Sequence, residues 1–569
     1  MTRTMCDGKA AAMPAEKEPL PQDKNGGWSV GKIRRPFLET VKKTECRRTW
    51  LCCGRRKDAG AGTVEPATPD DRQTTPRRPR SRVFVALRLA ALLAACMFSI
   101  SGSLIMWTTT AFDDFVANQV ILDSSKGSFE WWINPPINPW FKVYIWNYTN
   151  WDEYLQNQSV KIQLQEVGPF TYKEVIRRED IKFDRGVSLS YTEVKNYTFM
   201  PELSGADLND IVRVPSLPFF VSPLATTGHQ VQTFTSTLAT NLADAAVKPE
   251  TYSHVTLRAG DFIHGYDDPI FTMSKVIASD VPMEQVGLLA QKKPPDTMEI
   301  LTGASDIDRL SYFVSYNGKK SLGAWTDPAC NDVEGSDGSM FPPRKVRAKA
   351  PVLAFKAEAC RQIQFVFQEE TYAQGVPAYR YIIDRNTFMS PRTYPGNLCY
   401  CNQTDLEECA PDGLFDTSPC THGAPTLISY PHFYLSEPAA LEPFEGLSPD
   451  AEKHDMSADI HPRLGMTLQG KTRLQLNVRV RKGMKHLKKG LVLPVAWFAQ
   501  DLPEYTGSFK TMLVMSTYGL NCLELVLLYV LPVLAVLSAA LIVRRLAALG
   551  RERHAEAAME LRAPTSPNS

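Results

Sequence analysis

The sequence contains two long, uncharged, apolar segments, one near each end, and every N-glycosylation sequon lies between them. The segments cover residues 89–107 and 525–543. Because an α-helix rises about 1.5 Å per residue, each segment reaches roughly 30 Å, the thickness of the hydrocarbon core of a bilayer. We therefore predict membrane-spanning helices over residues 83–107 and 521–543.

The charges that flank these segments predict the orientation. Arginines precede the first segment and follow the second, and positive charge is typical of the cytoplasmic side. We therefore expect both termini to be cytosolic. The first segment begins too far from the N-terminus for a cleaved signal peptide. In this orientation the glycosylation machinery meets all four sequons, at Asn147, Asn157, Asn196 and Asn402.

This topology divides the chain into a cytosolic tail (1–82), an extracellular or lumenal ectodomain (108–520) and a second cytosolic tail (544–569). The first tail has nineteen basic and ten acidic residues, a net charge of +9. It is either a disordered tail or one that lies against anionic lipid head groups. Arg88 and Glu524 lie at the edges of the spans, where we expect a charged side chain to reach the membrane interface.

Six of the twelve cysteines lie in one stretch of the ectodomain: Cys330, Cys360, Cys399, Cys401, Cys409 and Cys420. An even number of cysteines in an oxidising compartment predicts three disulfides, with fifteen pairings open. Zinc binding is disfavoured because this stretch has no paired C-x2-C ligands. We expect no metal site.

The ectodomain alternates apolar and polar residues in many segments, including residues 141–146, 161–165 and 473–481. This pattern predicts antiparallel strands with one buried apolar face and one polar face in water. Residues 206–247 differ, because their apolar residues have irregular, partly helical spacing. The sequence therefore predicts an α+β ectodomain with a small helical cap on a mostly β body.

Ten segments, in order, are similar to those of the class B scavenger receptors, and they span nearly the whole ectodomain. The segments are 129–132 (FEWW), 166–172 (EVGPFTY), 265–269 (GYDDP), 303–306 (GASD), 341–343 (FPP), 375–381 (GVPAYRY), 399–401 (CYC), 429–433 (SYPHF), 443–447 (PFEGL) and 492–497 (VLPVAW).

The resemblance implies an antiparallel β-barrel core with short helices, a helical apex and an apolar tunnel that leads towards the bilayer. It implies three disulfides, Cys330–Cys399, Cys360–Cys420 and Cys401–Cys409. The family apex corresponds to residues 206–247. The resemblance implicates a lysine near the end of this region in fatty-acid contact, and Lys248 is the nearest candidate. Phe219, Phe220 and Phe234 are further candidate ligand contacts.

The resemblance also implies a cell-surface receptor that binds lipids, lipoproteins or other polyanionic ligands and mediates lipid uptake or endocytosis. Apoptotic cells, microbes or a protein cargo are further possible partners, and nucleic acid is not expected. The sequence has no P-loop, G-x-S-x-G, H-E-x-x-H or dinucleotide-binding glycine motif. We therefore expect no catalytic residues and no cofactor.

Two alternatives remain open. The first is a sorting receptor that carries a protein cargo to lysosomes, although neither tail has a tyrosine or an acidic dileucine signal. The plasma membrane is therefore preferred over a lysosomal or endosomal membrane. The second is a two-pass ligand-gated channel, although residues 525–543 carry no polar stripe to line a pore. His229 and His254, in or near the cap, are candidates for pH-sensitive ligand release.

Overall fold

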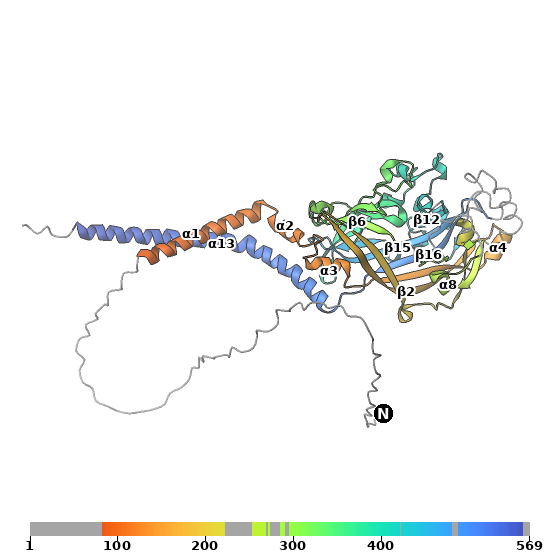
Figure 1. Cartoon of the computed structure of the whole chain (residues 1–569), viewed down its shortest axis with the longest axis horizontal. Coiled ribbons are helices and arrows are strands. Elements are labelled where there is room, and N and C mark those ends of the chain that lie inside the picture. The colour runs from red at the N-terminus through yellow and green to blue at the C-terminus, as the bar shows by residue number, and fades with distance from the viewer. Residues whose placement is uncertain are drawn as a thin grey trace, which may run out of the picture. The chain divides into compact units, whose positions relative to one another are not determined.

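A computed structural model describes residues 82–221, 253–268, 271–272, 285–290, 295–421, 423–480 and 487–561. Most of them form an ectodomain that is rich in antiparallel strands and carries short helices (Figure 1). Its strands are β1 (Trp140–Tyr148), β2 (Ile162–Asp184), β3 (Ser188–Phe199), β4 (Ile211–Pro215), β5 (His254–Arg258), β6 (Thr297–Leu301), β7 (Phe313–Tyr316), β8 (Val352–Lys356), β9 (Arg361–Ala373), β10 (Val376–Ile383), β11 (Leu414–Asp416), β12 (Thr426–Ser429), β13 (Phe444–Glu445), β14 (Ser457–Ile460), β15 (Thr467–Arg479) and β16 (Val492–Asp501). Its α-helices are α2 (Ala111–Asn118), α3 (Gly127–Ile133), α4 (Trp151–Gln156), α5 (Leu217–Val221), α8 (Ala259–His264), α10 (Pro343–Arg347), α11 (Pro438–Leu441) and α12 (Ala451–His454).

One large sheet runs in the order β7-β6-β3-β2-β1-β16-β15-β14-β10-β9-β8. Its two edges meet through a short segment around Ser336, which bridges both Tyr312, beside β7, and Ala354 in β8. The Ser336 N–H donates a hydrogen bond to the Leu353 carbonyl at 2.8 Å. The sheet is therefore nearly closed, and the prediction of an antiparallel β-barrel core is confirmed.

Residues 473–477 of strand β15 reverse the burial that the sequence predicts. Gln475 is fully buried, whereas its neighbour Leu474 keeps part of its surface exposed. A layer formed by residues 430–454 covers the polar face of the strand. The Gln475 side-chain oxygen accepts hydrogen bonds from Trp146 Nε1 at 3.2 Å and from the His432 N–H at 2.9 Å. The expectation of a polar face in water was wrong here, because these bonds replace those that water would supply.

The expected cap begins with a strand. Helical spacing predicts a helix after residue 206, but residues 211–215 form β4, which pairs antiparallel with β5. Val212 and Val214 are buried together because alternate residues of a strand share one face. The short helix α5 follows, and the rest of the cap, residues 222–247, lies outside the described residues together with residues 248–252.

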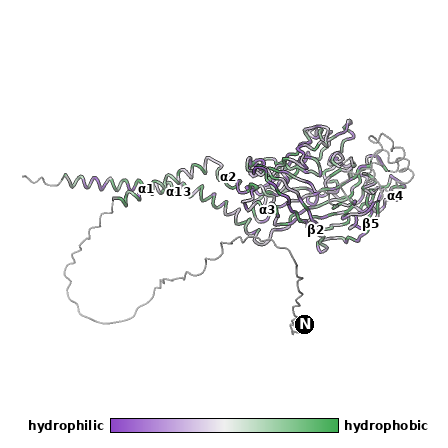
Figure 2. The backbone as a smooth tube through the Cα atoms, viewed as in Figure 1, coloured by the Kyte–Doolittle hydropathy of each residue, from purple (hydrophilic) through white to green (hydrophobic). Residues whose placement is uncertain are grey.

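Among the described residues, two helices are long and apolar enough to cross a membrane: α1 (Arg82–Thr108) and α13 (Gly507–Glu560). They pack against each other, and Figure 2 shows hydrophobic residues along both. The prediction of apolar terminal helices that flank the ectodomain is confirmed. Helix α13 extends beyond the expected span of residues 521–543 at both ends.

A hydrogen bond between the two helices compensates for a proline in α13. Pro532 has no N–H, so the Leu528 carbonyl loses its helical donor. The indole N–H of Trp107 in α1 donates to that carbonyl at 3.3 Å. Nearby, a Cβ on Gly102 would lie only 3.0 Å from Leu531 Cδ1. In an apolar environment every backbone polar group needs a partner, so this bond fixes the helices relative to each other.

Candidate functional site

The base of the expected cap is an aromatic cluster around Trp151 in α4, which is fully buried. Its ring packs against Tyr148 and Tyr154, with ring centroids 5.2 and 5.6 Å away. Its Nε1 donates a hydrogen bond to Ser253 Oγ at 3.3 Å. Ser253 directly precedes β5 and is the first described residue after 222–252. The cluster therefore fixes the start of β5, the strand that follows the cap.

Two of the four candidate ligand contacts, Phe219 and Phe220 in α5, lie in the same core. Their rings meet edge to face at 5.2 Å, and Phe220 is fully buried. In this conformation both residues support the start of the cap. Phe234 and Lys248 lie outside the described residues.

Of the two histidines near the cap, His229 also lies outside the described residues. His254, in β5, is 6.3 Å from Trp151 between ring centroids. Burial lowers the pKa of His254, and the charge of Arg213 lowers it further. This histidine therefore favours its neutral form.

A polar network lies against one face of the central strands and combines an accessible carboxylate with buried side chains of His432, His454 and Trp497. Glu166 of β2 accepts hydrogen bonds from His432 Nε2 at 2.8 Å and from Trp497 Nε1 at 3.0 Å. His432 Nδ1 accepts a hydrogen bond from the Ser448 N–H at 3.1 Å, so Nε2 carries the proton. The His432 ring stacks on His454, with centroids 4.3 Å apart.

The electrostatics of this network favour the ionised form of Glu166. Burial raises the pKa of Glu166, but the hydrogen bond and charge of His432 outweigh it, so the pKa is lowered overall. Burial, followed by the neighbouring His432, lowers the pKa of His454 to about 4. The network therefore holds a carboxylate beside a neutral His454. Sequence reasoning missed it, although the segments 166–172 and 429–433 contain two of its members.

The opposite face of the central strands carries partly accessible aromatic side chains. Phe498 follows Trp497 in β16, and successive residues of a strand point to opposite faces. Phe141 lies 5.3 Å from Tyr197 and 5.7 Å from Phe498 between ring centroids. All three keep part of their surface exposed. This face offers apolar contacts that solvent can reach.

Charged groups lie beside these aromatic residues on β2 and β3. The Tyr197 hydroxyl donates to Glu174 at 3.1 Å, and Lys195 Nζ lies 3.4 Å from Glu193 Oε1. Burial alone would lower the pKa of Lys195, but the charges of Glu193, Glu358 and Glu174 raise it overall. The aromatic face therefore borders a cation that stays protonated at neutral pH.

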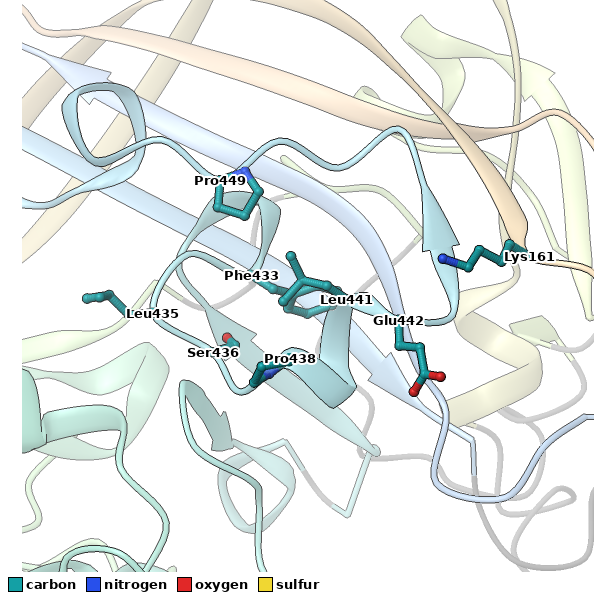
Figure 3. Close-up of a pocket in the computed structure, with 8 residues that line it drawn as sticks. All are labelled: Lys161, Phe433, Leu435, Ser436, Pro438, Leu441, Glu442 and Pro449. Atoms are coloured by element: carbon teal, nitrogen blue, oxygen red, sulfur yellow. The ribbon is translucent and has the colours of Figure 1, made fainter.

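A separate pocket of about 500 Å³ lies on the ectodomain surface beside α11 (Figure 3). Its lining combines mostly apolar side chains with one lysine and one glutamate: Lys161, Phe433, Leu435, Ser436, Pro438, Leu441, Glu442 and Pro449. Phe433 and Leu435 have positive φ angles of 54° and 61°. Volumes of this order hold small amphiphiles or single side chains.

The structure joins Cys330 to Cys399, Cys360 to Cys420 and Cys401 to Cys409, the pairing that the resemblance implies. The Cα–Cα distances are 5.9, 6.0 and 5.7 Å, within the usual range for a disulfide. Two of these bonds contribute to a core around Trp325, so they tie the loops at this side to the barrel.

The four sequon asparagines lie in different settings. Asn157 and Asn196 are exposed. Asn402 is also exposed, and its Nδ2 donates to the Ala324 carbonyl at 3.0 Å. Asn147, in β1, is partly buried and donates to Gln165 Oε1 at 3.2 Å. All four belong to the ectodomain, which lies between α1 and α13 in the sequence.

Comparisons with known proteins agree with this architecture. The chain is 28% identical over 463 residues to scavenger receptor class B member 1 of Sus scrofa, covering 79% of this chain and 88% of that protein. It is 29% identical over 402 residues to lysosome membrane protein 2 of Mus musculus, covering 69% and 80%. Lysosome membrane protein 2 of Homo sapiens is 26% identical over 415 residues, covering 71% and 83%.

A family model matches most of the chain. Residues 91–545 match the model of the CD36 family. The ordered sequence segments and the nearly closed barrel lie within this match, which also covers most of α1 and α13. The chain therefore belongs to the CD36 family of scavenger-type membrane receptors.

Proposed function

We propose that this receptor binds lipids or lipoproteins through its cap and passes lipid along the barrel to the bilayer. The observation that carries the proposal is the partly accessible aromatic face formed by Phe141, Tyr197 and Phe498. An acyl chain needs such a face, because each CH₂ group left in water costs roughly 0.8 kcal/mol. Membrane helices at both ends would hold the exit close to the bilayer.

In this proposal the transfer of lipid is downhill and needs no catalytic group. Lys195 borders the aromatic face and would attract the anionic head group of a fatty acid. The neighbouring Glu193 and Glu174 would weaken that attraction, so the lipid is not held tightly. A path of this kind favours the transfer of lipid over its tight binding.

The test is the uptake of a fluorescent long-chain fatty acid, and separately of oxidised lipoprotein, by cells that express the chain. We expect saturable uptake that is reduced several-fold by Leu474→Trp, which adds bulk to the partly accessible face of β15. Bulky substitutions in the cap should reduce lipoprotein capture as well.

The matched control is Leu203→Trp, because Leu203 is 46% exposed on the outer surface. It adds the same bulk away from the aromatic face and should leave uptake unchanged at equal surface expression. Equal uptake by both variants and the parent chain would reject the barrel path.

The proposed orientation places both termini in the cytosol and the ectodomain outside it. Replacing Asn147, Asn157, Asn196 or Asn402 by glutamine should then remove one glycan each. The measurement is electrophoretic mobility before and after enzymatic removal of N-glycans. Unchanged mobility in all four variants would reverse the proposed orientation.

We propose the plasma membrane as the main location. The similarity to lysosome membrane protein 2 supports a second candidate, a receptor that sorts a protein cargo to lysosomes. Immunofluorescence of permeabilised and intact cells separates the two: surface staining supports the first, and staining restricted to lysosomal compartments supports the second.

A further inference from the structure

Helix α13 packs against the ectodomain before it reaches the membrane. Leu513 is 3% exposed and Thr517 is 4% exposed, although both lie on a helix whose opposite side faces solvent. The residue that meets Thr517 is His461, which is 2% exposed and directly follows β14. The distance between His461 Nε2 and Thr517 Oγ1 is 3.1 Å.

The surrounding hydrogen bonds assign a neutral tautomer to His461. Its Nδ1 accepts hydrogen bonds from the N–H groups of Arg463 and Leu464, at 3.1 and 3.2 Å. The Thr517 hydroxyl donates to the Leu513 carbonyl at 2.7 Å, so it accepts from His461 Nε2. A second proton, on Nδ1, would point at two backbone N–H groups and break both bonds.

The charged groups near this contact come from four elements. Arg463 binds Glu524 of α13 and lies 3.3 Å from Asp113 of α2. Arg347 of α10 also binds Asp113 and lies 3.6 Å from Glu524. The two carboxylates are occupied by the two arginines, so neither contacts the His461 ring. Arg463, the nearest charge in sequence, opposes protonation of the ring.

We propose that His461 is an acid-sensitive latch that holds the lumenal turns of α13 on the ectodomain at neutral pH and releases them in acidic compartments. Protonation of the ring breaks the two bonds to Nδ1 and places a second positive charge beside Arg463. Release leaves the membrane helix in place and loosens the base of the ectodomain above it. This latch does not depend on the proposed lipid function.

The direction of the pH effect follows from the two pKa values. Burial, followed by the charge of Arg463, lowers the pKa of docked His461 to about 4, whereas a released, solvated histidine has its ordinary value of about 6.5. The docked state is therefore favoured fully above pH 6.5, and that advantage is lost as the pH falls towards 4. Between pH 7.4 and pH 5 the ratio of released to docked molecules should rise about 25-fold.

The experiment measures how accessible the docked face of α13 is. In the full chain, Leu513→Cys places a thiol on that face, and Met515→Cys places a reference thiol at a residue of the same helix that is 69% exposed and precedes the predicted span 521–543. Labelling of both cysteines with a water-soluble maleimide is measured by mass spectrometry at pH 7.4 and pH 5. The ratio between the two sites removes the pH dependence of the reagent itself.

We expect the labelling ratio of position 513 to position 515 to rise at least tenfold at pH 5. His461→Gln keeps a side-chain N–H for Thr517 but cannot be protonated, so the ratio should stay constant. His454→Gln removes another buried histidine, in the network around Glu166, and should leave the acid response intact.

An unchanged ratio in the Leu513→Cys chain overturns the proposal, as does an equal rise in the His461→Gln variant. Loss of the response in His454→Gln would assign it to the network around Glu166 and would also overturn the latch. Labelling involves no lipid, so these outcomes are independent of the uptake experiments.

Discussion

Replacing Trp151 by alanine should lower the free energy of unfolding of the ectodomain by about 3–5 kcal/mol. The indole is fully buried, and its removal leaves a cavity beside Tyr148 and Tyr154. It also leaves Ser253, where the cap returns, without its hydrogen bond from the indole. We therefore expect a loss of lipoprotein capture together with the loss of stability.

The measurement is the thermal unfolding midpoint of the purified full chain in detergent. For an ectodomain of this size, the change should be a decrease of roughly 3–6 °C. Trp151→Phe keeps most of the apolar contact and loses only the hydrogen bond to Ser253, so it should cost about 1 kcal/mol. Equal midpoints for Trp151→Ala and the parent chain would contradict the aromatic base described above.

Replacing Glu524 by glutamine should destabilise the contact between α13 and the ectodomain by about 2–3 kcal/mol, less than for a fully buried ion pair. The Glu524 carboxylate is 21% exposed and binds Arg463, whose side chain is 14% exposed, and it lies near Arg347. Removing the carboxylate leaves two arginines to share Asp113. The thermal midpoint of the full chain should fall by a few degrees.

A double-mutant cycle isolates this ion pair. The variants are Glu524→Gln, Arg463→Gln and the two combined, and the coupling energy should be at least about 1 kcal/mol. Glu524→Asp shortens the side chain and keeps the charge, and it should recover part of the stability. Additive effects of the single substitutions would show that the pair contributes little.

The sequence predicted the two apolar helices that flank the ectodomain, because length and hydropathy are read directly from the chain. The barrel and the three disulfide pairs were predicted from ten ordered segments that are similar to those of the class B scavenger receptors. Local pattern was less reliable for the cap, where β4 replaced the expected helix. Residues 211–215 form a strand because they pair with β5, which follows the rest of the cap in the sequence. Strand formation depends on such partners more than on local propensity.

Burial of polar residues could not be predicted from alternation. Gln475 belongs to the polar face of β15, yet it is fully buried because Trp146, 329 residues away in sequence, and His432 supply its hydrogen bonds. Glu524 was expected to reach the membrane interface. The alternation and hydropathy of the chain did not predict its partners, Arg463 in the turn after β14 and Arg347 at the end of α10.

By itself, the sequence predicted two apolar helices that flank the ectodomain, the segment that is covalently crosslinked and the family that the ectodomain resembles. These properties depend on composition, spacing and motif order, which are local or additive along the chain. Only the tertiary structure decided that His461 meets Thr517, that Glu166 lies beside two histidines and that Ser336 closes the barrel. Each of these contacts joins residues that are distant in sequence, so no local pattern contains them.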